Sequence, residues 1–234
     1  MLYLIAGAVV KANPQSEYMK EQMKPYLYEG AREADFSIET DRRHTDFVLG
    51  KNPALSFAEA EEICKAALFA RQIVNFNGLA VHASAISFEG GAYLFSAASG
   101  VGKSTHTAFW QKEFSDRVRI INDDRPIVRL DENNTAWVYG TPFSGCSGRH
   151  ENVCFPLKAV VFLKRADRNA VRRIEPAAAF FRLLENSRKK ESRAYLEKAA
   201  DVIGRLISAA DYYEMDCTNE PQAAVEAYRT IVKK

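Results

Sequence analysis

The hydrophobic pattern of this chain switches repeatedly between short apolar runs and longer segments with helical spacing. The short runs predict strands at 1–11, 36–40, 46–49, 79–87, 92–96, 118–121, 126–130, 135–139, 157–163, 171–174 and 212–217. The longer segments predict helices at 16–28, 56–74, 103–114, 175–184, 195–208 and 221–232. Strands 79–87 and 92–96 are separated only by a turn, which predicts a hairpin. A hairpin at this place is unusual among purely parallel sheets, so we expect a mixed α/β fold with a mixed β-sheet.

The clearest helix start lies at Ser56. Ser56 and Glu59 are three residues apart and can form a capping box, which satisfies free backbone donors at a helix start. Apolar residues then recur on one face, and we assign that face to core packing. Its members are Ile63, Ala66, Ala67, Ala70, Ile73 and Val74.

The region before this helix differs in character from the rest. We expect 1–55 to be a small, mostly antiparallel β region packed on the main domain, which spans 56–234. In it, 46–49 is predicted to pair with 36–40 through the polar stretch 41–44.

Composition narrows the class of protein. With 47% hydrophobic and 26% charged residues among 234, the chain should form a core rather than stay disordered. A net charge of +2 is too close to neutral to favour nucleic acid or a membrane surface as a partner. The run 2–10 is too short to span a bilayer. The four cysteines include no C-x-x-C pair, so we expect reduced thiols in a cytoplasmic protein.

Phosphate-binding chemistry is indicated by the stretch 95–105, which lies between a predicted strand and a predicted helix. Its glycines let the backbone turn sharply and approach an anion, Lys103 can reach phosphates, and the Ser104 hydroxyl suits Mg²⁺. The predicted nucleotide-binding residues are Ser99, Gly100, Val101, Gly102, Lys103, Ser104 and Thr105. Ala97 stands where the full pattern has its first glycine, and an ordinary glycine-rich turn is the alternative.

Acidic residues follow the next predicted strand. Asp123 and Asp124 lie about 20 residues after Lys103, where a phosphate-loop fold has its Mg²⁺-associated aspartate. Two adjacent carboxylates can divide the metal and acceptor sides of a reaction between them. The alternative for the pair is a solvated turn.

Three further features are less specific. His82 precedes the hairpin, whose pairing would bring it near the loop, although a lone strand histidine is more often structural. The irregular stretch 140–150 is a candidate lid or acceptor loop, and its Arg149 could steady phosphate charge, with a plain connecting loop as the alternative. The basic cluster Arg188-Lys189-Lys190 followed by Arg193 is interpreted as a solvated face.

Together these motifs resemble the HPr kinase/phosphorylase family and its shorter HPr kinase-like relatives, whose nucleotide site is similar to that of phosphoenolpyruvate carboxykinases. The resemblance covers roughly residues 60 to 230. It rests on Val81-His82-Ala83, the hairpin 85–95, the loop 99–104, Asn122-Asp123-Asp124, 140–145 and 156–163.

The resemblance implies a mixed α/β kinase domain that uses ATP and Mg²⁺. Carried over to this chain, Lys103 and the loop amides hold phosphates, and Ser104 with Asp123 serves the metal. Asp123 is also the acid/base residue for the acceptor hydroxyl, Asp124 supports the metal or acceptor side, and His82 lies beside the transferred phosphate.

This chain departs from the bifunctional members of the family. Thr105 replaces an acid, a later signature motif has no clear counterpart, and the separate N-terminal domain is missing. The acceptor is therefore left open between a protein, a peptide and a small molecule. The existence of a reverse reaction, the preference for ATP or GTP, and the formation of a homo-oligomer are left open as well.

The function we expect is ATP- and Mg²⁺-dependent transfer of the γ-phosphate to a serine-type hydroxyl. One alternative is a catalytically weak nucleotide-binding regulatory protein, which the alanine at position 97 motivates. Another is a carboxykinase-like small-molecule enzyme, which needs a second metal site with histidine and lysine ligands that we could not place among the four histidines.

Overall fold

The computed structural model describes residues 1–187 and 191–233, so the predicted basic face at Arg188-Lys189-Lys190 lies outside the described residues. The helices are α1 (Glu17–Met23), α2 (Arg42–Lys51), α3 (Phe57–Ile73), α4 (Lys103–Phe114), α5 (Pro176–Asn186), α6 (Arg193–Leu206) and α7 (Gln222–Ala227). The strands are β1 (Leu2–Ile5), β2 (Ala8–Lys11), β3 (Phe36–Ser37), β4 (Gly78–Ala80), β5 (Ala83–Phe88), β6 (Gly91–Ser96), β7 (Val118–Asn122), β8 (Ile127–Leu130), β9 (Ala136–Tyr139), β10 (Cys154–Arg165), β11 (Ala170–Arg173) and β12 (Asp211–Cys217).

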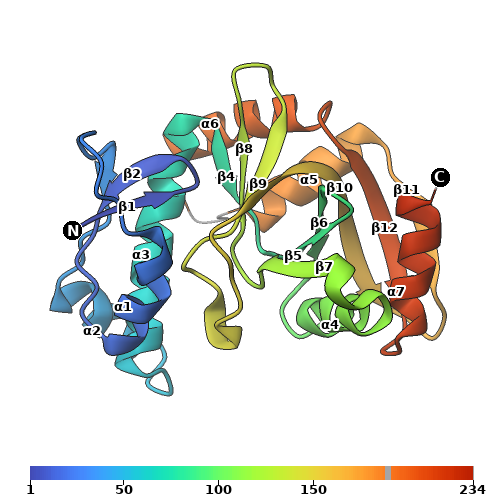
Figure 1. The fold of residues 1–234 in the computed structure, drawn as a ribbon, viewed down its shortest axis with the longest axis horizontal. Helices are drawn as coiled ribbons and strands as arrows, with labels where there is room; N and C mark the ends of the chain where they lie inside the picture. The colour runs from blue at the N-terminus through green and yellow to red at the C-terminus, as the bar shows by residue number, and fades with distance from the viewer. Residues whose placement is uncertain (188–190, 234) are drawn as a thin grey trace.

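A nine-stranded sheet forms the centre of the molecule (Figure 1). Its strands run in the order β4-β8-β9-β10-β6-β5-β7, and β12 joins β10 to β11. β10 is parallel to both β6 and β12, whereas the other pairs of this sheet are antiparallel. The mixed α/β fold and mixed sheet expected from the hairpin are therefore confirmed.

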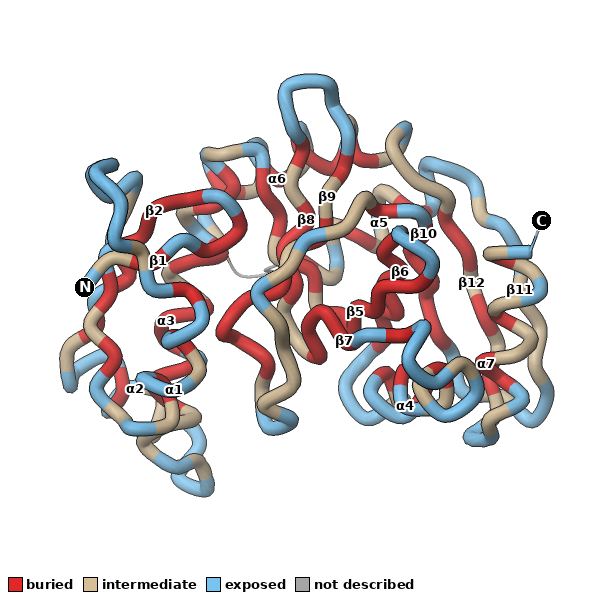
Figure 2. The backbone as a smooth tube through the Cα atoms, viewed as in Figure 1, coloured by how far each residue is buried: buried red, intermediate tan, exposed pale blue. Residues whose placement is uncertain are grey.

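Helices cover both faces of this sheet. Residues of α5 and α6, among them Leu183 and Ile203, share one core with the sheet. Residues of α4 and α7, among them Trp110 and Ala224, share a second core on the other face. Figure 2 shows the resulting pattern, with buried strands between helices whose outer sides are exposed. None of the helices in the described ranges is long and apolar enough to cross a membrane.

The N-terminal region forms a separate three-stranded sheet, in the order β1-β2-β3. Its core joins Ile5, Met19 and Phe69 of the N-terminal side to Ile127 and Phe143 of the main body. α3 thus packs against residues from both sides of position 55. The division at that position remains a prediction.

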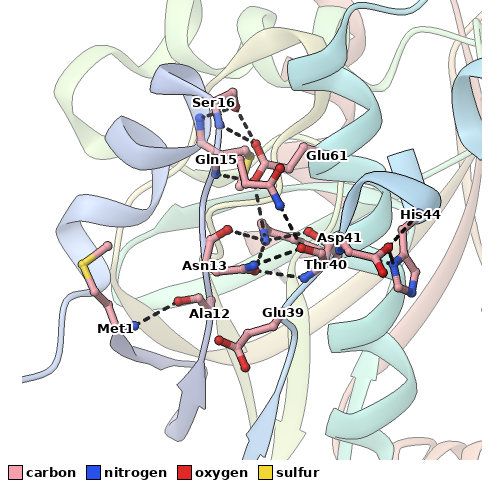
Figure 3. Close-up of polar contacts among 12 residues, drawn as sticks. Met1, Ala12, Asn13, Gln15, Ser16, Glu39, Thr40, Asp41, His44 and Glu61 are labelled. Atoms are coloured by element: carbon pink, nitrogen blue, oxygen red, sulfur yellow. Dashed lines mark hydrogen bonds and ion pairs between the residues drawn. The ribbon is translucent and has the colours of Figure 1, made fainter. Parts of the chain in front are cut away.

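A buried ionic network ties this region to α3. Glu61 and Lys65 are completely buried on α3, with 3.5 Å between the Glu61 Oε1 and Lys65 Nζ atoms. The Glu61 carboxylate accepts hydrogen bonds from the backbone N–H groups of Gln15 and Ser16, and Lys65 donates to Asn13 and to the Thr40 hydroxyl. Figure 3 shows Glu61 with Gln15 and Ser16, and Asn13 with Thr40.

The predicted strand 1–11 is wrong in one respect, because it is two strands. Ala6 and Gly7 have φ values of +49° and +76°, and they turn the chain so that β1 pairs antiparallel with β2. Two residues with positive φ form the compact turn that best joins twisted strands.

The predicted strand 46–49 is also wrong, because the segment is helical. The Asp41 carboxylate accepts a hydrogen bond from the backbone N–H of His44, and the backbone N–H of Asp41 donates to His44 Nδ1, so a capping box begins α2. The predicted strand 36–40 keeps only two residues as β3, which is parallel to β2. The N-terminal sheet therefore contains one antiparallel and one parallel pair.

The predicted strand 79–87 divides as well. β4 pairs with β8, while β5 pairs with β6 and β7, and the chain leaves one part of the sheet for the other at Val81 and His82. The hairpin of β5 and β6 is present as predicted. On α3 the capping box at Ser56 is present, but Ile63 is 38% exposed and does not belong to the buried face.

Candidate functional site

The glycine-rich stretch forms a loop between β6 and the start of α4. Gly100 and Gly102 have φ values of +79° and +114°, a conformation that side chains other than glycine rarely adopt. Ala97 is buried and does not have a positive φ, so an alanine at that position causes no backbone strain of this kind. The loop ends where the free N–H groups and positive dipole end of α4 favour an anion.

Arg165, at the end of β10, holds the outer side of this loop. Its Nη2 atom donates to the carbonyl oxygens of Gly100 at 3.1 Å and of Val101 at 3.5 Å. From the sequence, Arg149 was the arginine expected to be able to steady phosphate charge. Arg149 donates to Gln111 on α4 and does not line the cavity described below, so the arginine at the loop is a different one.

Lys103, His82 and Asp124 form a chain of polar contacts. The Lys103 Nζ and His82 Nε2 atoms are 2.9 Å apart, and the His82 Nδ1 and Asp124 Oδ1 atoms are 3.1 Å apart. The arrangement is satisfied when Lys103 donates to Nε2 and the Nδ1–H group donates to Asp124, which assigns the tautomer. The Ser96 hydroxyl donates to the His82 carbonyl oxygen at 2.9 Å and so holds the backbone there.

The charged groups in this series of polar contacts shift the pKa values of one another. Burial lowers the pKa of Lys103, and the carboxylates of Asp124 and Asp123 oppose that change. Burial acts to raise the pKa of Asp124, but the hydrogen bond from His82 and the charge of Arg125 outweigh it, so the pKa of Asp124 lies below its ordinary value. Asp124 is therefore an ionised group whose oxygens are already occupied, with Oδ2 contacting Arg125 Nε at 3.2 Å.

Asp123 has different surroundings from its neighbour. Its side chain is buried, and its Oδ1 atom accepts a hydrogen bond from the Ser84 hydroxyl at 2.5 Å. Its Oδ2 atom is buried and has no hydrogen-bond partner. Ser84 also lies 2.9 Å from the hydroxyl of Thr107 on α4, which links the carboxylate to the helix of the glycine-rich loop. An unpartnered carboxylate oxygen is costly to bury unless a proton, a metal or a ligand completes it.

Asn122 fixes the turn that carries both aspartates. Its side-chain oxygen accepts from the backbone N–H groups of Asp124 and Arg125, and its amide donates to the carbonyl oxygens of Thr141 and Phe143. One buried side chain thus joins the end of β7 to the segment that follows β9.

These groups line a single cavity of about 410 Å³. The predicted residues that line it are His82, Ser99, Gly100, Gly102, Lys103, Ser104, Thr105, Asp123 and Asp124. Val101 instead packs against the core between the sheet and α4. The cavity is also lined by four residues of the stretch 140–150, which was expected to be a lid or acceptor loop, namely Ser144, Gly145, Cys146 and Ser147, and by Arg165 and Asn219, which no sequence pattern indicated. Only the irregular composition of 140–150 signalled the first four of these.

The donors in the cavity fit a magnesium ion that is held partly by a nucleotide. In the parts of the chain that the structure describes, no group of three or more His, Cys, Asp and Glu residues could bind a metal. Mg²⁺ ordinarily takes one or two protein oxygens together with substrate phosphates and water. The Ser104 hydroxyl and the open oxygen of Asp123 are donors of this type.

A larger cavity of about 640 Å³ lies between α2 and α3. Its lining is mainly apolar, with Phe47, Ile63 and Leu68 among its members, and it contains none of the predicted site residues. The polar cavity at the glycine-rich loop is therefore the better candidate for chemistry.

Comparisons with known proteins add a distant structural similarity. No protein-family model matches the sequence, and no curated protein matches it. Among solved structures, HPr(Ser) kinase/phosphatase from Coxiella burnetii aligns with 66% of this chain and 99% of its own, at 11% sequence identity and a TM-score of 0.35. A similarity this distant carries no argument about the site, which rests on the geometry above.

Proposed function

We propose that this chain is an ATP- and Mg²⁺-dependent kinase that transfers the γ-phosphate to a serine-type hydroxyl of a protein, peptide or small molecule. The observation that carries the proposal is the buried, unpartnered Oδ2 atom of Asp123. This buried atom lacks a partner, and its carboxylate lines the same cavity as Lys103 and the glycine-rich loop.

The residues of the loop bind and orient the phosphates. Backbone N–H groups of residues 99–105 and the start of α4 receive phosphate oxygens, and Lys103 exchanges its contact with His82 for one with a phosphate oxygen. Mg²⁺, when bound, would neutralise phosphate charge, and the Ser104 hydroxyl and the phosphates themselves would hold it, which leaves Asp123 Oδ2 for the acceptor proton. Transfer then depends mainly on positioning and charge neutralisation.

Asp123 is the group that handles the proton of the acceptor. The acceptor oxygen forms a bond to the γ-phosphorus as the bond from that phosphorus to the β-phosphate oxygen breaks. ADP leaves, and the hydroxyl proton passes to Asp123 Oδ2. Ser84 occupies Oδ1, so only one oxygen of this carboxylate is open to the reaction.

The test is transfer of label from γ-labelled ATP to a panel of peptides, proteins and small hydroxyl compounds. We expect Lys103→Ala to abolish transfer and weaken ATP binding, because the variant loses the cation that reaches the phosphates. Lys112→Ala is the matched control, since Lys112 lies on the same helix and is exposed.

Full transfer by Lys103→Ala would contradict the assignment of the loop. Slow ATP turnover without any phosphorylated acceptor in the panel would instead favour the alternative of a nucleotide-binding regulatory protein.

A further inference from the structure

The segment Ser144–Ser147 lines the same cavity as the glycine-rich loop but differs from it in chemistry. It contributes small and hydroxyl side chains, whereas the loop contributes phosphate-binding groups. Gly145 has a φ of +63°, and a Cβ atom at this position would lie 3.2 Å from Asp124 Cβ and 3.3 Å from Asp124 Cγ. The backbone of Gly145 is thus packed directly on the side chain of Asp124. A displacement of this segment would open the cavity beside both aspartates.

Two side chains from α1 and α3 hold Gly145 from the other side. Its N–H group donates to Glu62 Oε1 at 2.7 Å, and its carbonyl oxygen accepts from the Tyr18 hydroxyl at 3.3 Å. Burial and the nearby Glu62 raise the pKa of Tyr18 to about 12, so the hydroxyl keeps the proton that it donates. Glu62 itself is only 5% exposed, which makes its hydrogen bond costly to lose.

The continuation of the segment is attached to the same region. His150 Nδ1 lies 3.0 Å from the Tyr26 hydroxyl, and the Asn152 side chain donates to the Pro25 carbonyl oxygen at 2.8 Å. On its inner side, the carbonyl oxygen of Arg149 accepts from the backbone N–H of Asp123. The chain after β9 therefore lies between the N-terminal region and the strand end that carries the aspartates (Figure 1).

The two anchoring residues are fixed relative to each other. Ser16 begins α1 by accepting from the Met19 N–H, and it also donates to Glu61, the neighbour of Glu62 on α3 (Figure 3). Tyr18 and Glu62 thus belong to helices joined by the buried network of Glu61 and Lys65.

We infer that Glu62 and Tyr18 are positioning residues that hold Gly145 against Asp124, so that the N-terminal region sets the acceptor side of the cavity. This inference rests on the proposed function and deepens it. In that function the loop 99–105 serves the nucleotide, and the wall at Ser144–Ser147, which packs on Asp124 in the cavity that Asp123 also lines, serves the hydroxyl acceptor.

The test is amide hydrogen exchange on peptides that contain Gly145, measured on the full chain without ligand. Glu62→Ala removes the acceptor of the Gly145 N–H, and we expect exchange to be about tenfold faster or more. Glu62→Gln keeps an acceptor oxygen and should restore slow exchange. Tyr18→Phe should speed exchange less, and Tyr28→Phe is its control because Tyr28 contacts Arg32 and not this segment.

ADP affinity with Mg²⁺ is the second readout. We expect it to stay within about threefold of the unaltered chain in Glu62→Ala, because the phosphates bind at the other wall. With an acceptor in hand, the KM for that acceptor should rise and the KM for ATP should not.

Unchanged exchange in both Glu62→Ala and Tyr18→Phe, or an equal effect of Tyr28→Phe, would overturn the inference. If Glu62→Ala does not fold, the comparison of Tyr18→Phe with Tyr28→Phe still decides the matter, because unchanged exchange in Tyr18→Phe would overturn the inference. Failure of the unaltered chain to bind ADP would overturn the proposed function alone, since the exchange experiment needs no nucleotide.

Discussion

The two adjacent aspartates that follow β7 have different hydrogen-bond partners, and their carboxylates therefore differ in chemistry. Asp124 is held by His82 and Arg125 and stays ionised with both oxygens in contact. Asp123 has one oxygen bound to Ser84 and one left open. The first therefore organises the site, and the second is available for reaction.

This difference predicts unequal effects of two matched substitutions. We expect Asp123→Asn to lower the rate of phosphate transfer by about a thousandfold or more, because the amide cannot accept the acceptor proton. Asp124→Asn should have a smaller effect, through loss of the His82 contact. The measurement is the transfer rate at saturating ATP, with ADP affinity as the control for folding. Equal losses in both variants would contradict the separate roles.

The sequence was informative about residues whose chemistry repeats in a recognisable spacing. Gly100, Gly102, Lys103 and the aspartate pair could be named because phosphate binding requires those types in that order. Ser84 and Arg165 could not be named. A serine within a strand and an arginine at a strand end are common everywhere, and only the pairing of β5 with β7 and of β10 with β6 brings them to the site.

At the scale of elements, α4 packs against the sheet through a buried histidine, whose surroundings disfavour the protonated form. His106 is buried and contacts Phe95 with ring centroids 4.6 Å apart and the ring planes tilted by 55°, and its Nε2 atom accepts from Trp110 Nε1 at 3.1 Å. Burial lowers the pKa of His106 to about 3. The folded protein therefore keeps this side chain neutral at pH values where the unfolded chain protonates it.

The consequence is a stability that depends on pH. Between about pH 6.5 and pH 3 the unfolded state binds the extra proton, so this group lowers the free energy of unfolding by up to about 1.4 kcal/mol per pH unit as the pH falls. Urea unfolding of the unaltered chain and of His106→Gln at pH 7 and pH 5 measures it. The variant should be less stable at pH 7 yet lose less stability at pH 5. Parallel losses in both proteins would contradict the prediction.

Elements were predicted well where a local signal fixed their ends. The capping box of Ser56 and Glu59 gave the start of α3, and the helix of the glycine-rich loop has the predicted bounds. The failures came from signals that compete locally. Asp41 followed by arginines resembled a polar turn, although its side chain caps α2. The break between β4 and β5 at Val81 and His82 could not be seen in the sequence, because the residues around it are still apolar.

At the scale of the whole molecule, the N-terminal region and the main body share one apolar core and one buried ionic network. Lys65 lies at the centre of that network, where it contacts Asn13, Thr40 and Glu61. A buried charge that loses its partner is strongly destabilising.

We expect Lys65→Met to lower the free energy of unfolding by about 3–5 kcal/mol, because the buried Glu61 carboxylate is left without its cation. Urea unfolding provides the measurement. Lys20→Met is the control, since Lys20 forms an exposed pair with Glu17 and should matter little. A stability close to that of the unaltered chain would show that the backbone N–H donors of Glu61 suffice on their own.

The pairing of the long strand β10 affects how exposed the sheet is while the chain is being synthesised. Its apolar residues Ala159 to Phe162 pair with β6, which precedes them, and with β12, which does not emerge until residues 211–217 have been synthesised. Until then one edge of β10 offers unpaired backbone groups beside apolar side chains, which is the template on which chains aggregate. β12 covers this edge and brings Asp211, Glu214 and Asp216, whose charges oppose such association. β12 thus covers the edge of β10 once it has been synthesised. A chain interrupted before residue 211 lacks this strand and would be the form most prone to self-association.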